Sequence, residues 1–251
     1  MSKATFLKYE KPLITAMVQG ATADRVEELV RLSTEDGAEA FGMQFCRVKA
    51  EYRNADTYKR LFSSACGCPI YVTNYRDGEN AGKDDQTLAN ELIELAECGA
   101  TLCDVMGDIF DPQDDQMAKD PTAIEKQKEL IDRLHSAGAE VLMSSHVMKF
   151  TSPERVLEIA LEQQRRGADI CKIVVGAENM SDQIENLKIA TMLREKLSIP
   201  FLFLSGGETR ILRRFGGELG CCMYLCVHEH DALATPAQPL IKCVKSIRDG
   251  D

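Results

Sequence analysis

The sequence predicts a single (β/α)8 barrel over residues 1–251, and three observations lead to this fold class. Short apolar runs typical of buried strands alternate with longer segments whose apolar residues recur at helical spacing. The alternation repeats through the whole chain, and 251 residues allow about 31 residues for each of eight strand–helix units. The apolar runs lack polar alternation, which indicates parallel strands covered on both faces of the sheet.

The units can be followed in order along the chain. The first four place strands at residues 13–18, 40–45, 70–74 and 101–105, followed by helices at 23–33, 57–64, 86–98 and 124–136. The last four place strands at 140–144, 170–175, 201–205 and 221–227, followed by helices at 153–165, 182–196, 209–215 and 236–247. Ser152-Pro153 is typical of a helix start, and Gly138 and Gly167 are typical of residues that follow a helix end.

Composition excludes several classes of protein. The chain has 44% hydrophobic and 28% charged residues with only 8 prolines and 17 glycines, which is neither disordered nor collagen-like. A net charge of −10 repels polyanions and acidic membranes, so neither nucleic acid nor a membrane is an expected partner. A small anionic substrate stays possible, because a few local arginines can set the sign of the field in a cleft.

The N-terminal sequence and the apolar runs predict a cytoplasmic protein. Residues 1–12 lack the apolar core of a signal peptide, and no apolar run approaches the ~20 residues of a membrane-spanning helix. The ten cysteines fall mostly inside strand-like runs, as is typical of reduced intracellular thiols.

A lysine interrupts the sixth apolar run, which reads DICKIVV from residue 169 to 175. Lysine is almost never fully buried without a reason, and burial lowers its pKa toward the range in which the free amine attacks carbonyl carbons. Lys172 is therefore a candidate nucleophile. The alternative is a structural lysine at a strand end, paired with a neighbouring carboxylate.

A histidine follows the fifth apolar run, in MSSHVMK at residues 143–149. Barrels of this class carry their chemistry at the carboxyl ends of the strands, and histidine is the side chain best suited to move protons near neutral pH. His146 is thus a candidate proton-transfer residue one unit before Lys172, although a lone histidine is more often structural.

The seventh unit ends in LSGGETRILRR at residues 204–214. Glycines at a strand end leave backbone N–H groups for an anion, and three arginines add positive charge, which suits a carboxylate or a phosphate. Alternatively the glycines form only a tight turn and the arginines a solvated helix face. A metal site at His228, His230 and Cys226 is weakly indicated, because no second ligand pair has a recognised spacing, and we expect no metal.

Several motifs occur in a specific order: SSH at 144–146, TSP at 151–153, GADICKI at 167–173, SGG at 205–207, Arg214, and PAQ at 236–238. With these motifs the chain resembles the type I 3-dehydroquinate dehydratases over nearly its whole length. The resemblance implies a (β/α)8 lyase of the shikimate pathway that needs no metal or cofactor and forms a homodimer.

The resemblance also implies roles for particular residues. Lys172 would form a Schiff base with the substrate ketone, and the protonated imine would act as an electron sink. His146 would remove the proton beside the imine carbon and then deliver a proton to the departing hydroxyl. Glu79 matches the glutamate that orients this histidine, and Arg214 and Gln238 match residues that hold the substrate carboxylate.

The chain departs from the family pattern around the second to fourth strands. Gly42, Gln44 and Cys46 stand where the family has Glu-x-Arg-x-Asp. Tyr75 stands where a substrate-contacting arginine is expected, although Arg76 is adjacent. In addition, Met106 replaces an acidic residue and Ala234 replaces a serine.

These departures predict a rebuilt substrate pocket. Each unmatched polar contact at a buried site costs about 1–3 kcal/mol, so several losses would weaken dehydroquinate binding greatly. Less polar walls from Gly42, Phe45, Cys46 and Met106 favour a carboxylated cyclic ketone with fewer or differently placed hydroxyls. The candidates for substrate contacts are Gln44, Tyr75, Arg76, His228 and His230.

Two other functions stay open from the sequence. A class I aldolase acting on a phosphorylated or carboxylated keto substrate also uses a strand-six lysine, but no obvious Asp/Lys/Tyr set is found on the early strands. A non-catalytic barrel that binds a small ligand could lose polar pocket residues in this way. Keeping both a buried lysine and a nearby histidine argues against it, since an unpaired buried amine is destabilising.

Overall fold

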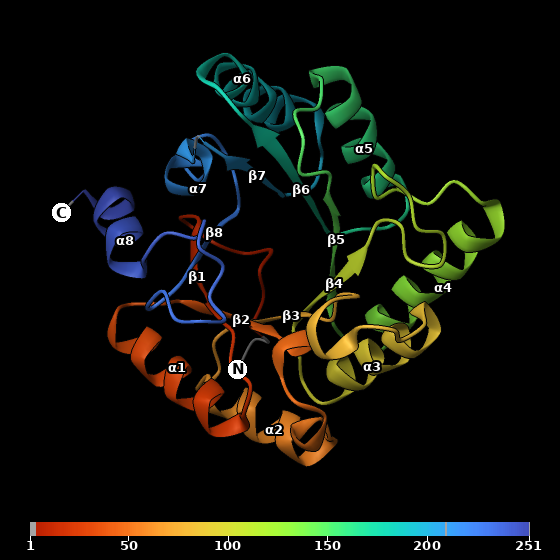
Figure 1. The fold of residues 1–251 in the computed structure, drawn as a ribbon, viewed down its shortest axis with the longest axis vertical. Coiled ribbons are helices and arrows are strands. Elements are labelled where there is room, and N and C mark those ends of the chain that lie inside the picture. Colours follow the sequence, from red (N-terminus) through yellow and green to blue (C-terminus); the bar gives the residue numbers. More distant parts are fainter. Residues whose placement is uncertain (1–3, 209, 251) are drawn as a thin grey trace.

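A computed structural model describes residues 4–208 and 210–250. Eight parallel strands form a barrel, and helices surround it, so the predicted (β/α)8 class is confirmed (Figure 1). The strands pair in the order β7-β6-β5-β4-β3-β2-β1-β8. Their carboxyl ends therefore lie on one side of the barrel, where functional loops of this fold gather.

The elements alternate throughout the described chain. The strands are β1 Leu13–Val18, β2 Ala40–Gln44, β3 Ile70–Thr73, β4 Leu102–Met106, β5 Glu140–His146, β6 Ile170–Ala177, β7 Phe201–Gly207 and β8 Met223–Cys226. The α-helices are α1 Ala23–Glu35, α2 Ala55–Ser64, α3 Asp85–Glu97, α4 Pro121–Ser136, α5 Pro153–Arg165, α6 Met180–Lys196, α7 Ile211–Phe215 and α8 Ile241–Asp249. Three short 3-10 helices lie in loops after β2 and β3: η1 Phe45–Arg47, η2 Ala50–Tyr52 and η3 Gly78–Asn80.

The predicted elements agree with the structure except near some of their ends. Strands β5 and β6 each extend two residues beyond their predicted ends, so that His146 is the last residue of β5. The last helix begins at Ile241 and not at residue 236, because Leu240 pairs with Val227 in an isolated parallel bridge. The seventh helix was expected from Thr209, which lies outside the described residues.

Local capping explains where the central helices start and stop. The Ser152 side chain accepts a hydrogen bond from the Arg155 N–H at the start of α5. Gly138 and Gly167 follow the ends of α4 and α5 with φ of 83° and 99°, a left-handed backbone that favours glycine. The predicted helix ends are confirmed at these positions, and they fix where β5 and β6 begin.

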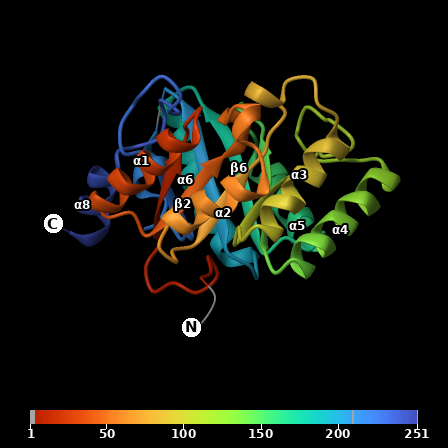
Figure 2. The same cartoon turned by 90° about the horizontal axis from the view of Figure 1, so that it is seen from below.

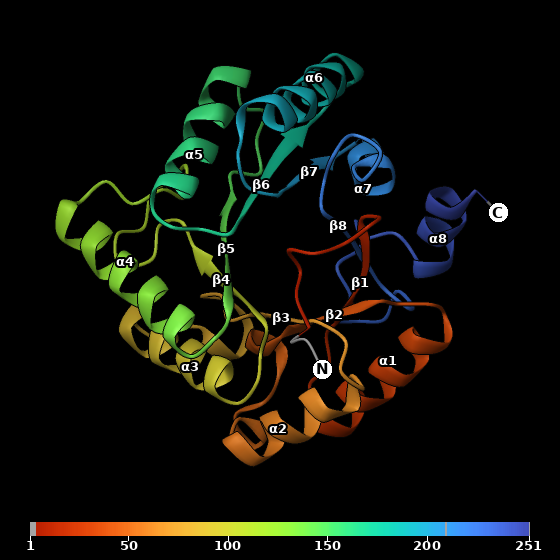
Figure 3. The ribbon, with the colours of Figure 1, turned by 180° about the vertical axis from the view of Figure 1, so that it is seen from behind.

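The barrel closes between its last two strands near their amino ends. The Cys222 N–H donates to the Phe201 carbonyl over 2.9 Å, whereas β1 and β8 are joined by a longer ladder from Leu13 to Ala16. This completes the ring that Figure 3 shows from the opposite end.

The segment of residues 4–12 covers the amino-terminal end of the barrel, below the strands in Figure 2. Phe6 is 0% exposed, and its N–H donates to the Glu140 carboxylate at the start of β5 over 2.9 Å. The Phe6 ring packs edge-on against Tyr71 with ring centroids 6.5 Å apart. This end of the barrel is therefore sealed beneath Tyr71, and access to the interior comes from the carboxyl ends of the strands.

Candidate active site

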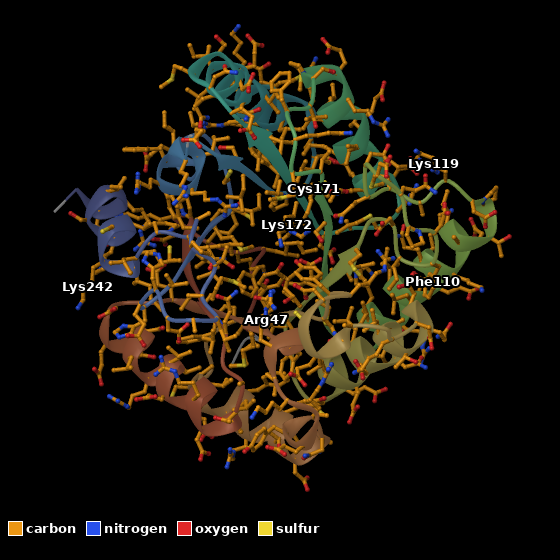
Figure 4. The ribbon with its side chains drawn as sticks, viewed as in Figure 1. Arg47, Phe110, Lys119, Cys171, Lys172 and Lys242 are labelled. Carbon is orange, nitrogen blue, oxygen red and sulfur yellow. The ribbon has the colours of Figure 1, made fainter. Side chains whose placement is uncertain are left out.

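Alternate residues of four neighbouring strands bring polar side chains to the barrel interior. Residues two apart on a strand share a face, so Lys172 of β6 lies in register with Ser144 of β5, two residues before His146. Asp104 of β4 and Tyr71 of β3 reach the same level of the interior. Figure 4 shows Lys172 near the centre of the barrel, with Cys171 labelled beside it on the same strand.

The Lys172 ammonium is surrounded by three oxygen atoms. Its Nζ lies 2.8 Å from the Tyr75 hydroxyl, 2.9 Å from the Tyr71 hydroxyl and 3.1 Å from Asp104 Oδ2. Asp104 in turn accepts hydrogen bonds from both tyrosine hydroxyls and, at Oδ1, from Ser144 over 2.5 Å. We call these five residues the lysine cluster; every member is held by at least one other.

Burial and the ion pair set the charges of the lysine cluster. Burial lowers the pKa of Lys172, and the Asp104 carboxylate opposes that shift. Burial alone would raise the pKa of Asp104, but the Lys172 charge and the hydrogen bonds from Ser144 and Tyr71 together hold it below its usual value. Asp104 is thus ionised, and Lys172 rests as an ammonium whose three protons each have an oxygen acceptor.

The two tyrosines are neutral phenols. Burial and the Asp104 charge raise the pKa of both Tyr71 and Tyr75 well above 10. Each hydroxyl donates its proton to Asp104 and accepts one from Lys172. The alternative prediction for Lys172 was a lysine at a strand end, paired with a carboxylate. The pairing is confirmed, because Lys172 contacts Asp104. The position is not, because Lys172 lies inside β6 and is only 4% exposed.

His146 lies beside the lysine cluster and is uncharged. Burial and the Lys172 charge lower the pKa of His146 from 6.5 to about 3. The imidazole packs edge-on against the Tyr75 ring with ring centroids 5.2 Å apart. The backbone N–H of His146 donates to the Gln116 side-chain oxygen over 2.5 Å. A neutral imidazole can accept a proton, which is what a general base at this place requires.

Glu79 does not reach His146. It lies in η3, on the loop between β3 and α3, and its side chain is exposed. The predicted role of Glu79 as the residue that orients His146 is therefore wrong for this structure. The Gln116 side chain accepts from the backbone N–H of His146, and the Tyr75 ring packs against the imidazole itself.

A cavity of about 520 Å³ opens onto Lys172 at the carboxyl ends of the strands. This volume lies within the usual range for small-molecule sites. Its walls combine polar and apolar side chains: Met17, Gln44, Thr73, Tyr75, Arg76, Asp77, Met106, Gln116, His146, Met148, Lys172, Val174, Leu204, Arg213, Leu225, Thr235 and Gln238. The cavity thus brings together Lys172, His146, Gln238, Gln44, Tyr75 and Arg76 from the predicted site.

Of the two neighbouring arginines of α7, Arg213 lines the cavity and Arg214 does not. Arg213 is 8% exposed, lines the cavity and donates from Nε to the Ser205 carbonyl over 2.9 Å. No carboxylate among the described residues pairs with Arg213, and burial lowers its pKa to about 10. Arg214 is exposed and lies outside this cavity, so its predicted place at the substrate is wrong.

Gln238 lies beside Arg213 with unused hydrogen-bonding capacity. The side chain is 6% exposed, and its Oε1 has no hydrogen-bond partner. Thr235 lines the same wall, next to the alanine at the position where a serine was expected. We call Arg213, Gln238 and Thr235 the arginine end of the cavity; the Arg213 guanidinium, which bonds to the protein only through Nε, suits a carboxylate.

Gln44 and Arg76 line the cavity with their polar groups engaged. Gln44 accepts a hydrogen bond from Gln19, which ties β2 to β1. The Arg76 guanidinium contacts Asp85 over 2.7 Å and Asp108 over 2.8 Å. These two carboxylates neutralise Arg76, so the predicted contact of Arg76 with an anionic substrate is not favoured by this geometry.

The second strand explains part of the altered pocket. A Cβ atom at Gly42 would come within 2.3 Å of the Met17 sulfur and 3.1 Å of the Tyr71 ring. Met106 lines the cavity as predicted, but Phe45 and Cys46 do not. Phe45 instead packs edge-on against Tyr58, with ring centroids 5.0 Å apart, and both Phe45 and Cys46 are buried.

The two histidines after β8 point to different partners. His228 Nδ1 lies 2.7 Å from Asp36, and His230 Nε2 lies 2.8 Å from the Gln238 carbonyl. Neither lines the cavity at Lys172. In residues 4–208 and 210–250, no group of three or more His, Cys, Asp or Glu side chains is arranged to hold a metal ion.

Sequence reasoning missed three members of the site: Asp104, Tyr71 and Arg213. The statement that the early strands carry no Asp/Lys/Tyr set is wrong, because Asp104 and the two tyrosines contact Lys172. Asp104 is the only charged residue in the apolar run of β4, the same signal that identified Lys172 in β6. No comparable signal distinguishes Arg213 from its neighbours.

The fold and the site define a (β/α)8 barrel with a buried lysine inside β6 and a neutral histidine at the carboxyl end of the neighbouring strand β5. The family model of type I 3-dehydroquinase matches residues 47–249. The chain belongs to this family of hydro-lyases.

Individual relatives agree with the family match. A 3-dehydroquinate dehydratase of Geobacillus thermodenitrificans is 24% identical over 250 residues, 98% of this chain and 93% of its own length. One from Alkaliphilus oremlandii is 35% identical over 92 residues, only 36% of either chain. The solved type I 3-dehydroquinate dehydratase of Clostridium difficile, with covalently modified comenic acid, has a TM-score of 0.81 at 16% identity and covers 97% of this chain and 93% of its own.

More distant barrels share the fold. A solved 3-hexulose-6-phosphate synthase of Salmonella typhimurium has a TM-score of 0.56 at 14% identity and covers 95% of this chain. Among the described helices, none is long and apolar enough to cross a bilayer.

Proposed function

We propose that the chain is a Schiff-base-forming dehydratase that removes water from a carboxylated cyclic ketone, 3-dehydroquinate or a relative of it. The observation that carries the proposal is the position of Lys172: a buried amine with a lowered pKa opens onto a cavity beside an uncharged His146. At the same cavity Arg213 has no carboxylate partner among the described residues.

The reaction divides between the two ends of the cavity. The carboxylate binds at the arginine end, and the ketone carbon meets Lys172 Nζ, which forms the imine as water leaves. The protonated imine draws electrons from the neighbouring carbon, so His146 can take the proton from that carbon. The electron pair then expels the hydroxyl on the next carbon, His146 returns its proton to that hydroxyl as water leaves, and hydrolysis of the imine frees Lys172.

His146 performs this role without a carboxylate partner. A histidine paired with a carboxylate gains basicity, whereas burial beside Lys172 lowers the pKa of His146 to about 3. Protonation of the imine also lowers the pKa of the C–H group beside the imine carbon. The pKa difference between this carbon acid and His146 is therefore smaller, and the proton transfer to His146 is less unfavourable. The neutral state of His146 is secured through the whole neutral pH range.

The substrate pocket favours fewer hydroxyls than 3-dehydroquinate carries. Met17 and Tyr71 fill the space at Gly42, and Met106 presents a thioether where the family pattern has an acid. A buried hydroxyl without a partner costs about 1–3 kcal/mol. We therefore infer a substrate with the ketone, the carboxylate and the leaving hydroxyl, and with less ring oxygenation around them.

Turnover of two ketones tests this function. The enone absorbance is followed with 3-dehydroquinate and with 1-hydroxy-3-oxocyclohexane-1-carboxylate, which lacks the two other ring hydroxyls. We expect enone from both and a higher kcat/KM for the less oxygenated compound. Higher kcat/KM for 3-dehydroquinate would contradict the altered pocket, and enone from neither compound would contradict the dehydratase function.

A class I aldolase is the second candidate, and the lysine cluster favours it. Carbon–carbon cleavage through an imine needs an acid–base group near the lysine nitrogen, and Asp104, Tyr71 and Tyr75 are hydrogen-bonded there. Mass analysis of the products separates the two functions. Fragments of the carbon skeleton would favour the aldolase, whereas a product lighter by one water favours the dehydratase.

A further inference from the structure

We propose that Tyr75 is a proton-transfer catalyst of imine formation, which moves protons from the Lys172 nitrogen to the departing oxygen of the ketone while Asp104 stores one proton. The proposal rests on the Schiff-base function proposed above and assigns a step within it. Tyr75 transfers the protons between the lysine nitrogen and the ketone oxygen, whereas His146 transfers the proton on carbon.

The two tyrosines have the same partners but different access to substrate. Both hydroxyls contact Lys172 Nζ, at 2.9 Å for Tyr71 and 2.8 Å for Tyr75, and both donate to Asp104. Tyr71 is 0% exposed and does not line the cavity, and Phe6 covers it from the amino-terminal end of the barrel. Tyr75 lines the cavity, so only its hydroxyl can reach both the lysine nitrogen and a bound ketone.

The proton count of the step needs no outside donor. The resting Lys172 ammonium carries three protons, and the protonated imine carries one. The other two leave with the ketone oxygen as water. One proton moves from the ammonium to Asp104, which frees the amine to attack the carbonyl carbon and form the carbon–nitrogen bond.

The remaining transfers pass through the Tyr75 hydroxyl. A second proton moves from the nitrogen through this hydroxyl to the carbonyl oxygen, which gives the neutral carbinolamine. The proton held by Asp104 then follows the same route, the carbon–oxygen bond breaks, and water departs. Asp104 is again a carboxylate beside the cationic imine.

The surroundings of Tyr75 favour a relay over a free acid. Burial and the Asp104 charge raise the pKa of Tyr75 well above 10, so a separated tyrosinate would be costly. A hydroxyl that accepts one proton as it gives up another avoids this state. Tyr75 already donates to Asp104 and accepts from Lys172, which is the arrangement such a transfer requires.

His146 is poorly placed for the protons at nitrogen. Its ring packs edge-on against Tyr75, and no hydrogen bond joins its ring nitrogens to Lys172 within the described chain. Its side chain lines the cavity beside Tyr75, where it can reach a substrate carbon next to the imine carbon. The geometry assigns the two residues to two different protons.

Oxygen exchange of a probe ketone isolates this step from dehydration. The probe is 3-oxocyclohexane-1-carboxylate labelled with ¹⁸O at the ketone, which has no hydroxyl to lose and can only form and release the imine. Loss of label measures imine formation, and deuterium uptake beside the ketone measures proton removal from carbon. Borohydride reduction confirms the adduct on Lys172.

Tyr75→Phe and Tyr71→Phe form a matched pair, since each removes one hydroxyl that contacts the same two groups. We expect Tyr75→Phe to slow ¹⁸O loss by about 10²-fold and Tyr71→Phe by about tenfold or less. His146→Ala should slow deuterium uptake much more than ¹⁸O loss. Thermal unfolding of each variant checks that the fold is kept.

Two results would overturn the relay while leaving the Schiff-base function intact: equal ¹⁸O loss for the two tyrosine variants, or a greater slowing by His146→Ala than by Tyr75→Phe. A wild-type protein that gives neither exchange nor a borohydride adduct would contradict the Schiff-base function itself, and the relay with it.

Discussion

The lysine cluster and the arginine end, which meet at one cavity, differ in how their polar atoms are satisfied. In the cluster, Lys172 Nζ has three hydrogen-bonding partners in the protein, and the Asp104 carboxylate has four. At the arginine end, Arg213 uses only Nε, and Gln238 Oε1 has no partner. The first region is complete without a substrate, and the second is not.

This difference indicates how the cavity is divided. Only Nε of the Arg213 guanidinium bonds to the protein, so its other donors are open to an anion in the cavity. The lysine cluster instead holds Lys172 as an ammonium beside the Asp104 carboxylate, and both groups have their hydrogen bonds made within the protein. We therefore propose that the cavity binds substrate through its β7–β8 side and reacts with it on its β3–β6 side.

The largest expected effect tests the reactive side. Lys172→Ala removes the amine, so turnover should fall by at least about 10⁴-fold and borohydride should trap no ketone. Lys188→Ala is the matched control, because this lysine lies on α6 with its side chain 65% exposed. Turnover of Lys172→Ala within tenfold of wild type would place the chemistry elsewhere.

The second prediction distinguishes the role of His146 from that of Lys172. His146→Ala should lower kcat by about 10²–10⁴-fold, because it removes the group that carries the carbon proton. The imine should still form, so the adduct on Lys172 should persist in mass spectra. Loss of the adduct together with the rate would mean that His146 acts on the nitrogen instead.

A third effect sharpens the contrast between the two sides. Arg213→Ala removes a charged donor of the carboxylate, worth about 1.5–3 kcal/mol, so KM should rise by about 10–100-fold with a smaller change in kcat. Arg214→Ala is the control on the same helix, since its side chain is exposed. A larger rise in KM for Arg214→Ala would restore the expectation made from the sequence.

The smallest effect concerns stability and pH. The pKa of His146 is about 3 in the folded chain and 6.5 when unfolded, so the unfolded chain binds this proton first as the pH falls. Stability is unaffected by His146 above pH ~6.5 and decreases below it, by about 2 kcal/mol at pH ~5. The free energy of unfolding, measured with denaturant at pH ~6.5 and at pH ~5, should show this decrease in the wild-type protein and not in His146→Gln. Equal losses in the two proteins would mean that His146 titrates normally.

Much of the fold and the reactive side could be predicted from the sequence. Apolar runs of buried strands locate β5 and β6 well, and a lysine or histidine within such a run points to chemistry. Asp104 could have been found by the same reasoning applied to β4. Its pairing with Lys172 could not, because two strands that are not neighbours meet only when the barrel closes.

The binding side was less predictable for a physical reason. Successive helix residues point about 100° apart, so a change of one residue in the start of α7 decides which arginine enters the cavity. The five-residue α7 has no side-chain cap that fixes this start. Glu79 failed similarly, because the direction of a side chain in η3 does not follow from its spacing to the strand.

If Lys172 is the nucleophile of this cavity, borohydride will trap the substrate as a covalent adduct on its Nζ. The wild-type protein is incubated with 3-dehydroquinate, reduced with borohydride, weighed intact and digested for peptide mapping. We expect one reduced adduct per chain, on the peptide that contains Lys172. No adduct, or an adduct on another lysine, would contradict it.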